Sequence, residues 1–123
     1  MYTSRMGSLR TKETQDKYSA YKEAGELEVG CRLCEAPALE TFTYWKVVDN
    51  KFPYDKAAST HHMILPIEHW GEADLTEEAW AEFEELKKTY LNQHYEFLIE
   101  PMAKMKSIPA HFHLHIIVAS ESF

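Results

Sequence analysis

The chain has 123 residues, 45% of them hydrophobic, which is enough apolar material for one domain and too little for two. Its formal net charge is -7, and its lysine and arginine residues are dispersed along the sequence. This argues against a nucleic-acid backbone as the main partner, because such binding depends on clustered cations, and leaves small-molecule partners open. The sequence contains no apolar run of membrane-spanning length, and residues 1–17 lack the apolar segment of a signal peptide. We therefore expect a soluble, cytoplasmic protein.

The N-terminal part of the chain predicts a helix. The segment TKETQDKYSAYKEA, from Thr11 to Ala24, is polar and rich in helix-favouring residues, and Gly25 stands where a glycine would end a helix. We interpret residues 1–30 as a helical extension appended to a main domain of residues 31–123.

Two segments that resemble strands follow. FTYWKVVDN and HHMILPI are rich in β-branched and aromatic residues, and the segment between them, NKFPYDKAAST, contains Pro53. This pattern predicts two strands paired as a hairpin and joined by a long loop.

The longest predicted helix comes after EHWGEA, with Asp74 as its candidate N-cap. The apolar residues that follow recur at helical spacing: Leu75, Ala79, Phe83, Leu86 and Tyr90. A strand YEFLIE, a polar loop PMAKMKSIPA and a strand HFHLHIIVA complete the chain. The order β-β-α-β-β predicts an α+β fold, with an antiparallel sheet of about five strands and one long helix packed on a face.

The chain's two cysteines, Cys31 and Cys34, form a C-x-x-C pair in GCRLCEAP. In a reducing compartment this spacing suggests a metal or redox site before a disulfide. A thioredoxin-like pair would need a βαβ context, and the segment here continues through Glu35 and Pro37 into a stretch that looks like strand. Two incidental thiols are the alternative.

The last predicted strand carries histidines at every second position: His111, His113 and His115. Side chains two apart in a strand share a face at a spacing of roughly 6.6 Å, which separates His111 from His115 by roughly 13 Å. One ion cannot easily use both, because the donor atoms around one zinc ion lie within about 3.5 Å of each other. A metal could take His111 and leave the other two for different chemistry. Three structural histidines are the alternative, although several buried rings would then be desolvated without benefit.

The segment HFHLHII resembles the defining pattern of the histidine-triad (HIT) superfamily, His-φ-His-φ-His-φ-φ with φ apolar, at all seven positions. NKFPYD resembles the strand end that contacts the nucleotide in that family. THHMILPIEHW resembles the family segment H-x-L-V-I-P-x-x-H, which places His61 and His69. The resemblance covers Cys31 to Val118 and implies an antiparallel sheet with a long helix between strands.

The C-x-x-C pair makes the chain more similar to the zinc-binding branch of that superfamily, which includes galactose-1-phosphate uridylyltransferase. In that branch two cysteines, the histidine after the proline of the second segment and the first triad histidine bind zinc. By position, the resemblance implies Cys31, Cys34, His69 and His111 as the ligands. Two cysteines and two histidines fill a tetrahedral shell, so the Zn²⁺ ion would be structural.

The resemblance also implies an enzyme, a nucleotidyl hydrolase or transferase with His113 as the nucleophile. In the family the middle histidine attacks the α-phosphorus of a nucleotide ester, amide or anhydride, and water or another acceptor resolves the nucleotidyl-histidine. His115 would contact phosphate oxygens, and His61 would help to orient the triad. Asn50 matches the position that binds a ribose hydroxyl, with a turn-capping asparagine as the alternative.

The loop before the triad departs from the family pattern. Nucleotide hydrolases of the family carry a glycine-rich loop with a glutamine or serine just before the triad, and an asparagine upstream. Here the loop has no glycine, Glu100 stands about where the asparagine is expected, and the candidate leaving-group contact Ser107 lies four positions before His111. The second hypothesis is therefore a non-catalytic nucleotide- or phosphate-binding module, and a zinc-stabilised scaffold without a ligand is a third.

Three further expectations concern residues outside these motifs. His62 should point to the sheet face opposite His61, and His94 should lie on the surface. Small triad proteins are often two-fold dimers, and three tryptophans with several tyrosines are a large aromatic content for one small core, so we expect a homodimer.

Overall fold

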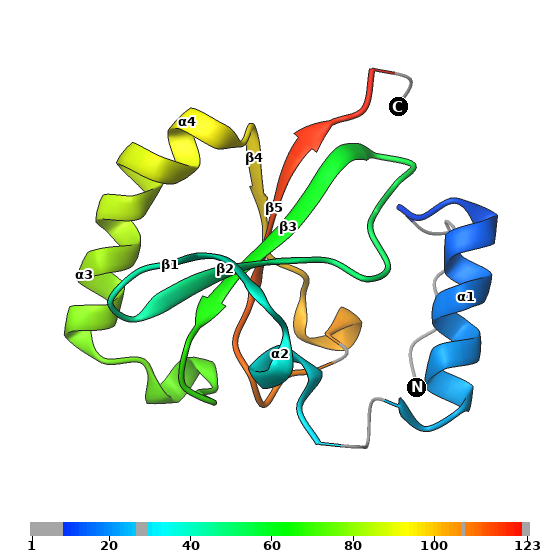
Figure 1. Ribbon diagram of the computed structural model, residues 1–123, viewed down its shortest axis with the longest axis horizontal. Helices are drawn as coiled ribbons and strands as arrows, with labels where there is room; N and C mark the ends of the chain where they lie inside the picture. The colour runs from blue at the N-terminus through cyan, green and yellow to red at the C-terminus, as the bar shows by residue number, and fades with distance from the viewer. Residues whose placement is uncertain (1–8, 27–29, 107, 122–123) are drawn as a thin grey trace.

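The computed structural model describes residues 9–26, 30–106 and 108–121, and it contains one antiparallel sheet with helices around it (Figure 1). The strands are paired in the order β1-β2-β3-β5-β4. Their bounds are β1 (Ala38–Thr41), β2 (Trp45–Asp49), β3 (Ala58–Pro66), β4 (Phe97–Ile99) and β5 (Leu114–Ala119). The helices are α1 (Lys12–Glu23), α2 (Arg32–Glu35), α3 (Glu77–Leu86) and α4 (Asn92–His94), with short turns η2 (Glu72–Asp74), η3 (Lys87–Leu91) and η4 (Ala103–Met105). The expected α+β class and the antiparallel sheet of five strands are confirmed.

Strands β3 and β5 form the middle of the sheet, and the alternation of their side chains sets its two faces. Met63 pairs with His115, and Ile64 pairs with Leu114. Ile64 and Leu114 join the core under α3, whereas Met63 packs with Leu33 of α2. Strand β5 therefore presents Leu114 and Ile116 to the long helix and His115 to the face that carries α2.

The long helix begins later than the sequence pattern predicted. Thr76 is the N-cap of α3, and its hydroxyl accepts a hydrogen bond from the Ala79 N–H at 3.1 Å. The prediction of Asp74 as the cap is wrong, because Leu75 has extended backbone and interrupts the turn. Asp74 instead accepts a hydrogen bond from the Gly71 N–H at 2.9 Å.

The apolar residues predicted for the long helix do face the sheet. The three that are buried in α3 are Ala79, Phe83 and Leu86, and Leu75 and Tyr90 pack against the same core. The indole N–H of Trp45 donates to the Ala79 carbonyl at 2.7 Å, so this buried tryptophan ties β2 to α3. Residues 87–91 continue the helix as a π turn before α4.

Two strand predictions need correction. The expected strand FTYWKVVDN starts only at Trp45, because residues 42–45 form a turn in which the Phe42 N–H donates to the Trp45 carbonyl at 2.8 Å. The expected strand HFHLHIIVA starts at Leu114. Its first residues pair with loops instead, since the Phe112 N–H donates to the Trp70 carbonyl at 2.7 Å.

The predicted N-terminal helix is confirmed. The Thr11 side chain caps α1, and Gly25 follows with a positive φ of 78°, a conformation that glycine adopts without strain. The Tyr18 and Tyr21 rings lie 5.2 and 5.0 Å from the Phe52 ring, so α1 packs on the loop between β2 and β3. Figure 1 shows α1 on the side of the molecule away from α3 and α4. Within the described ranges, no helix has the length and apolar character that crossing a membrane requires.

Candidate metal centre and histidine site

Four side chains that the sequence proposed as metal ligands converge in the structure. The donor atoms of Cys31, Cys34, His69 and His111 all lie within 4.8 Å of one another. The Cys34 Sγ atom is 3.2 Å from His69 Nδ1 and 3.4 Å from His111 Nδ1, and the Cys31 Sγ atom is 3.5 Å from His111 Nδ1. The cluster joins α2, the segment after β3 and the segment before β5, and it could hold a metal ion.

The buried ring of His111 is oriented for this cluster by the backbone. Its Nε2–H donates to the Pro66 carbonyl at 2.9 Å, which leaves the lone pair on Nδ1 facing the two sulfur atoms. Burial lowers the pKa of His111, and the bond to the carbonyl partly opposes that change. A neutral imidazole whose second nitrogen donates to a carbonyl has the arrangement that metal-ligating histidines adopt.

His113 has a fixed tautomer as well. Its Nδ1 lies 2.9 Å from the His111 carbonyl oxygen, which only accepts hydrogen bonds, so Nδ1 carries the proton and Nε2 carries the lone pair. Burial lowers the pKa of His113, and the hydrogen bond to the His111 carbonyl partly offsets this. The ring is therefore neutral near pH 7 and offers a basic nitrogen.

His61 and His115 form a directed hydrogen-bond chain. The Tyr54 N–H donates to His61 Nδ1 at 2.8 Å, so the proton of the neutral His61 ring lies on Nε2. That nitrogen lies 2.7 Å from His115 Nδ1, which must accept, and the remaining proton of His115 is then on its own Nε2. The centroids of the His113 and His115 rings are 5.4 Å apart. The site thus combines a lone pair on one histidine with a proton donor on its neighbour.

Asn50, predicted to bind substrate, is placed beside His61 and is buried. Its Oδ1 accepts a hydrogen bond from the Phe52 N–H at 2.8 Å. Its Nδ2 lies 3.2 Å from His61 Nε2, which is a contact between two donors when the His61 proton is on Nε2. The amide therefore closes the turn after β2 and contacts the His61 ring. The turn-capping interpretation of Asn50 describes these contacts.

The remaining histidines and loop residues lie apart from this site. His62 points to the other face, where its Nδ1 is 2.7 Å from the Tyr95 hydroxyl, and His94 is exposed, as the sequence predicted. Glu100 is exposed on the segment after β4. The predicted contact Ser107 lies outside the described residues.

Two residues that the sequence did not single out lie at this site: Tyr54 packs against the histidines, and Arg10 packs against Tyr54. The Tyr54 ring centroid lies 4.4 Å from that of His61 and 5.0 Å from that of His115. The Arg10 Cζ atom lies 4.9 Å from the Tyr54 ring centroid, and its Nε donates to the Phe52 carbonyl at 2.8 Å. Tyr54 belongs to the segment NKFPYD, so its position was available from the motif. Arg10 precedes the predicted helix, and no pattern marked it.

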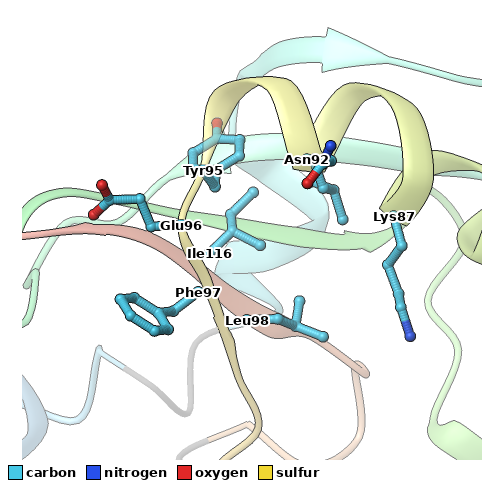
Figure 2. Close-up of a pocket in the computed structure, with 8 residues that line it drawn as sticks. Lys87, Asn92, Tyr95, Glu96, Phe97, Leu98 and Ile116 are labelled. Atoms are coloured by element: carbon cyan, nitrogen blue, oxygen red, sulfur yellow. The ribbon is translucent and has the colours of Figure 1, made fainter.

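The groove in Figure 2 is separate from the histidine site. It has a volume of about 180 Å³, and it lies between the end of the long helix, β4 and β5. Its lining residues are Lys87, Leu91, Asn92, Tyr95, Glu96, Phe97, Leu98 and Ile116. Ile116 belongs to the core under α3, which places the groove on the face opposite His115. None of its side chains supplies the lone pair or the thiols found at the other site.

Acid should destabilise the protein through the buried pair His61 and His115. Burial first, and then nearby Arg10, lowers the pKa of His61 from 6.5 to about 3, and burial with His61 lowers that of His115 to about 2. Between these values and 6.5 the unfolded chain binds protons that the folded chain excludes, so stability falls as pH falls. Each histidine lowers the free energy of unfolding by up to about 1.4 kcal/mol per pH unit. For the pair, the loss between pH 6 and pH 5 is about 2 kcal/mol.

The measurement is urea unfolding across that pH range for the wild type and for His115→Gln. The variant keeps an acceptor for His61 and the same metal cluster, and its pH slope should be smaller by about one proton. An unchanged slope would show that His115 is protonated in the folded protein.

Comparison of the chain with protein-family models and with curated proteins finds no match in either set. The metal cluster and the histidine geometry are therefore the basis on which the function of this chain is inferred.

Proposed function

We propose that this chain is a nucleotidyl hydrolase or transferase of the histidine-triad type, with His113 as its nucleophile. The observation that carries the proposal is the hydrogen bond from His113 Nδ1 to the His111 carbonyl. It holds the proton on one nitrogen and leaves the lone pair on Nε2, while burial keeps the ring neutral by lowering its pKa. A neutral, oriented imidazole is a competent nucleophile near pH 7.

The reaction proceeds in two displacements. The Nε2 lone pair of His113 attacks the α-phosphorus of the nucleotide, and the bond from phosphorus to the leaving oxygen or nitrogen breaks with its electron pair going to the leaving group, which takes up a proton. Water or another hydroxyl then attacks the same phosphorus and loses a proton. The phosphorus–nitrogen bond breaks, and its electron pair returns to Nε2.

His115 and His61 support the first displacement through the direction of their hydrogen bonds. Tyr54 N–H donates to His61, and His61 donates to His115, so the Nε2–H of His115 is the donor at the end of the chain. We assign this donor to a phosphate oxygen, where it stabilises the charge that develops in the transition state. His61 is a positioning residue in this scheme.

We propose Zn²⁺ as the ion of the metal cluster. Tetrahedral zinc with its usual bond lengths separates a sulfur ligand from a nitrogen ligand by about 3.6 Å, and three of the sulfur–nitrogen pairs here are 3.2 to 3.5 Å apart, with all donor atoms within 4.8 Å of one another. The four protein ligands complete the shell, so a zinc ion there would supply structure and no open coordination position. His111 would connect the two sites, because its ring belongs to the cluster and its carbonyl orients His113.

A specific observation favours a second candidate, a nucleotide- or phosphate-binding module without turnover. Asn50 is buried, and its Oδ1 already accepts a hydrogen bond from the Phe52 N–H, which leaves one lone pair of that oxygen for a ribose hydroxyl. Glu100 brings a carboxylate to the loop where the family pattern has an asparagine.

Binding and turnover of a small panel separate the two candidates. The panel contains an adenylyl phosphoramidate, a dinucleoside polyphosphate and a nucleotide sugar, and the readouts are the thermal shift of the protein and release of the nucleoside monophosphate. Binding with product release supports the enzyme. Binding without release supports the module, and no thermal shift with any compound contradicts both.

A further inference from the structure

We propose that Arg32, the residue after the first cysteine of the C-x-x-C pair, binds the phosphoryl group of the ligand at the histidine site. This role of Arg32 rests on the proposed function, because the phosphoryl group that Arg32 would bind is the one that His113 would attack. It adds a phosphate-binding side chain that belongs to the segment of the metal cluster.

The Nε atom of Arg32 is buried and has no hydrogen-bond partner among the described residues. An arginine is always charged, and a buried donor without a partner is costly, so proteins place such groups beside carboxylates or other acceptors. The described residues provide no carboxylate within ion-pair distance of this guanidinium. Its Cζ atom lies 5.8 Å from the Tyr21 ring centroid and 6.0 Å from that of Phe52, and these rings flank the side chain without accepting its Nε–H.

The location of Arg32 points to the histidine site. Burial is the main cause that lowers the pKa of His113, and among the charged groups that add to this effect the Arg32 guanidinium acts most strongly, ahead of Lys106. The pKa of His115 is lowered first by burial and by His61, and then by several further groups that include Arg32. Geometry places the segment of Arg32 at the same site: the Sγ atom of the preceding Cys31 lies 3.5 Å from His111 Nδ1, and the His111 carbonyl accepts the hydrogen bond from His113 Nδ1 at 2.9 Å.

The charge around the site contrasts with that of the whole chain. The chain carries a net charge of -7, yet three cations, Arg10, Arg32 and Lys51, lie over the aromatic rings at this end of the sheet, with Asp55 as a nearby carboxylate. Lys51 lies 4.5 Å above the Tyr21 ring, and Arg10 lies over Tyr18 and Tyr54. A group of cations in an acidic protein favours the binding of an anion over that of a neutral nucleoside.

The shape of the guanidinium selects among anions. Its Nε–H and one terminal N–H form a planar fork that matches two oxygens of a phosphate or phosphoryl group. The backbone of α2 holds Arg32 between Cys31 and Cys34, so a metal ion in the cluster would also fix the base of this side chain. The same anion would satisfy the buried Nε and bring phosphorus to the histidines.

The test is calorimetric binding of AMP and of adenosine to the full, zinc-loaded chain and to three variants. Arg32→Gln should weaken AMP binding by at least tenfold and leave adenosine binding unchanged. Arg32→Lys keeps the charge without the fork and should give an intermediate loss. Lys88→Gln removes an exposed cation from the long helix and should bind AMP as the wild type does.

Zinc content and melting temperature are measured for each variant. If Arg32→Gln loses zinc, the AMP affinity of Arg32→Lys is used for the comparison instead. Equal AMP affinity in wild type and the Arg32 variant would overturn the inference, as would a wild type that does not bind AMP. If the Arg32 variants lose AMP binding and the wild type turns over no substrate, the proposed enzyme is contradicted and Arg32 is still the phosphate ligand. Turnover that does not change in the Arg32 variants supports the enzyme and contradicts the role of Arg32.

Discussion

Replacing His113 with alanine is expected to reduce nucleotide turnover by about 10³-fold or more, because the variant lacks the nitrogen that attacks phosphorus. Zinc content and the unfolding transition should change little. The His113 ring belongs to neither hydrophobic core cluster, and its Nδ1–H donates to the His111 carbonyl. The measurement is the initial rate of monophosphate release from the most active compound of the panel.

Two further variants make this result specific. His115→Ala removes one donor to the phosphate and should slow the reaction by about 10² to 10³-fold, which is the usual cost of losing one such donor. His94→Ala removes an exposed histidine at the end of the long helix and should leave the rate unchanged. An active preparation that keeps its rate after His113→Ala would exclude His113 as the nucleophile.

Protein purified without a chelator is expected to contain one zinc ion per chain. The Cys34→Ser substitution should lower the melting temperature by about 10 °C or more. A ligand present a thousandfold above its dissociation constant stabilises the folded state by about 4 kcal/mol. For a domain of this size that is worth roughly 10 °C or more in melting temperature. Elemental analysis and thermal unfolding measure the two quantities.

The chelator response separates a lost metal from a damaged core. Chelator should lower the melting temperature of the wild type and have little further effect on Cys34→Ser. Glu35→Gln, an exposed substitution in the same short helix, should respond to chelator as the wild type does. Wild-type protein with well under one zinc per chain, and with no response to added zinc, would contradict the metal assignment.

The sequence predicted the helices correctly where the residue pattern within a segment matches the contacts that the segment makes in the fold. The spacing of Ala79, Phe83 and Leu86 predicted the face that α3 buries, and Gly25 marked the end of α1. Strand bounds were less accurate, because they depend on partners that are distant in the chain. The backbone of Phe112 bonds to Trp70, and this contact keeps the start of the predicted strand out of the sheet.

The set of four candidate metal ligands was implied by the resemblance to the zinc-binding branch of the histidine-triad pattern, and the structure brings their donor atoms together. The environment of the histidines was not predictable in the same way. The burial of Asn50, the stacking of Tyr54 on His61 and His115, and the buried Nε of Arg32 result from packing between segments that no local pattern connects.

The most direct test of His113 as the nucleophile is isolation of the covalent intermediate. Zinc-loaded protein is mixed with a labelled adenylyl phosphoramidate or dinucleoside polyphosphate and quenched in base, where a phosphorus–nitrogen bond to histidine survives, and the digest is mapped by mass spectrometry. We predict a nucleotidyl adduct on His113, and no adduct in His113→Ala. Rapid turnover without any adduct, or an adduct on a different residue, would contradict the account.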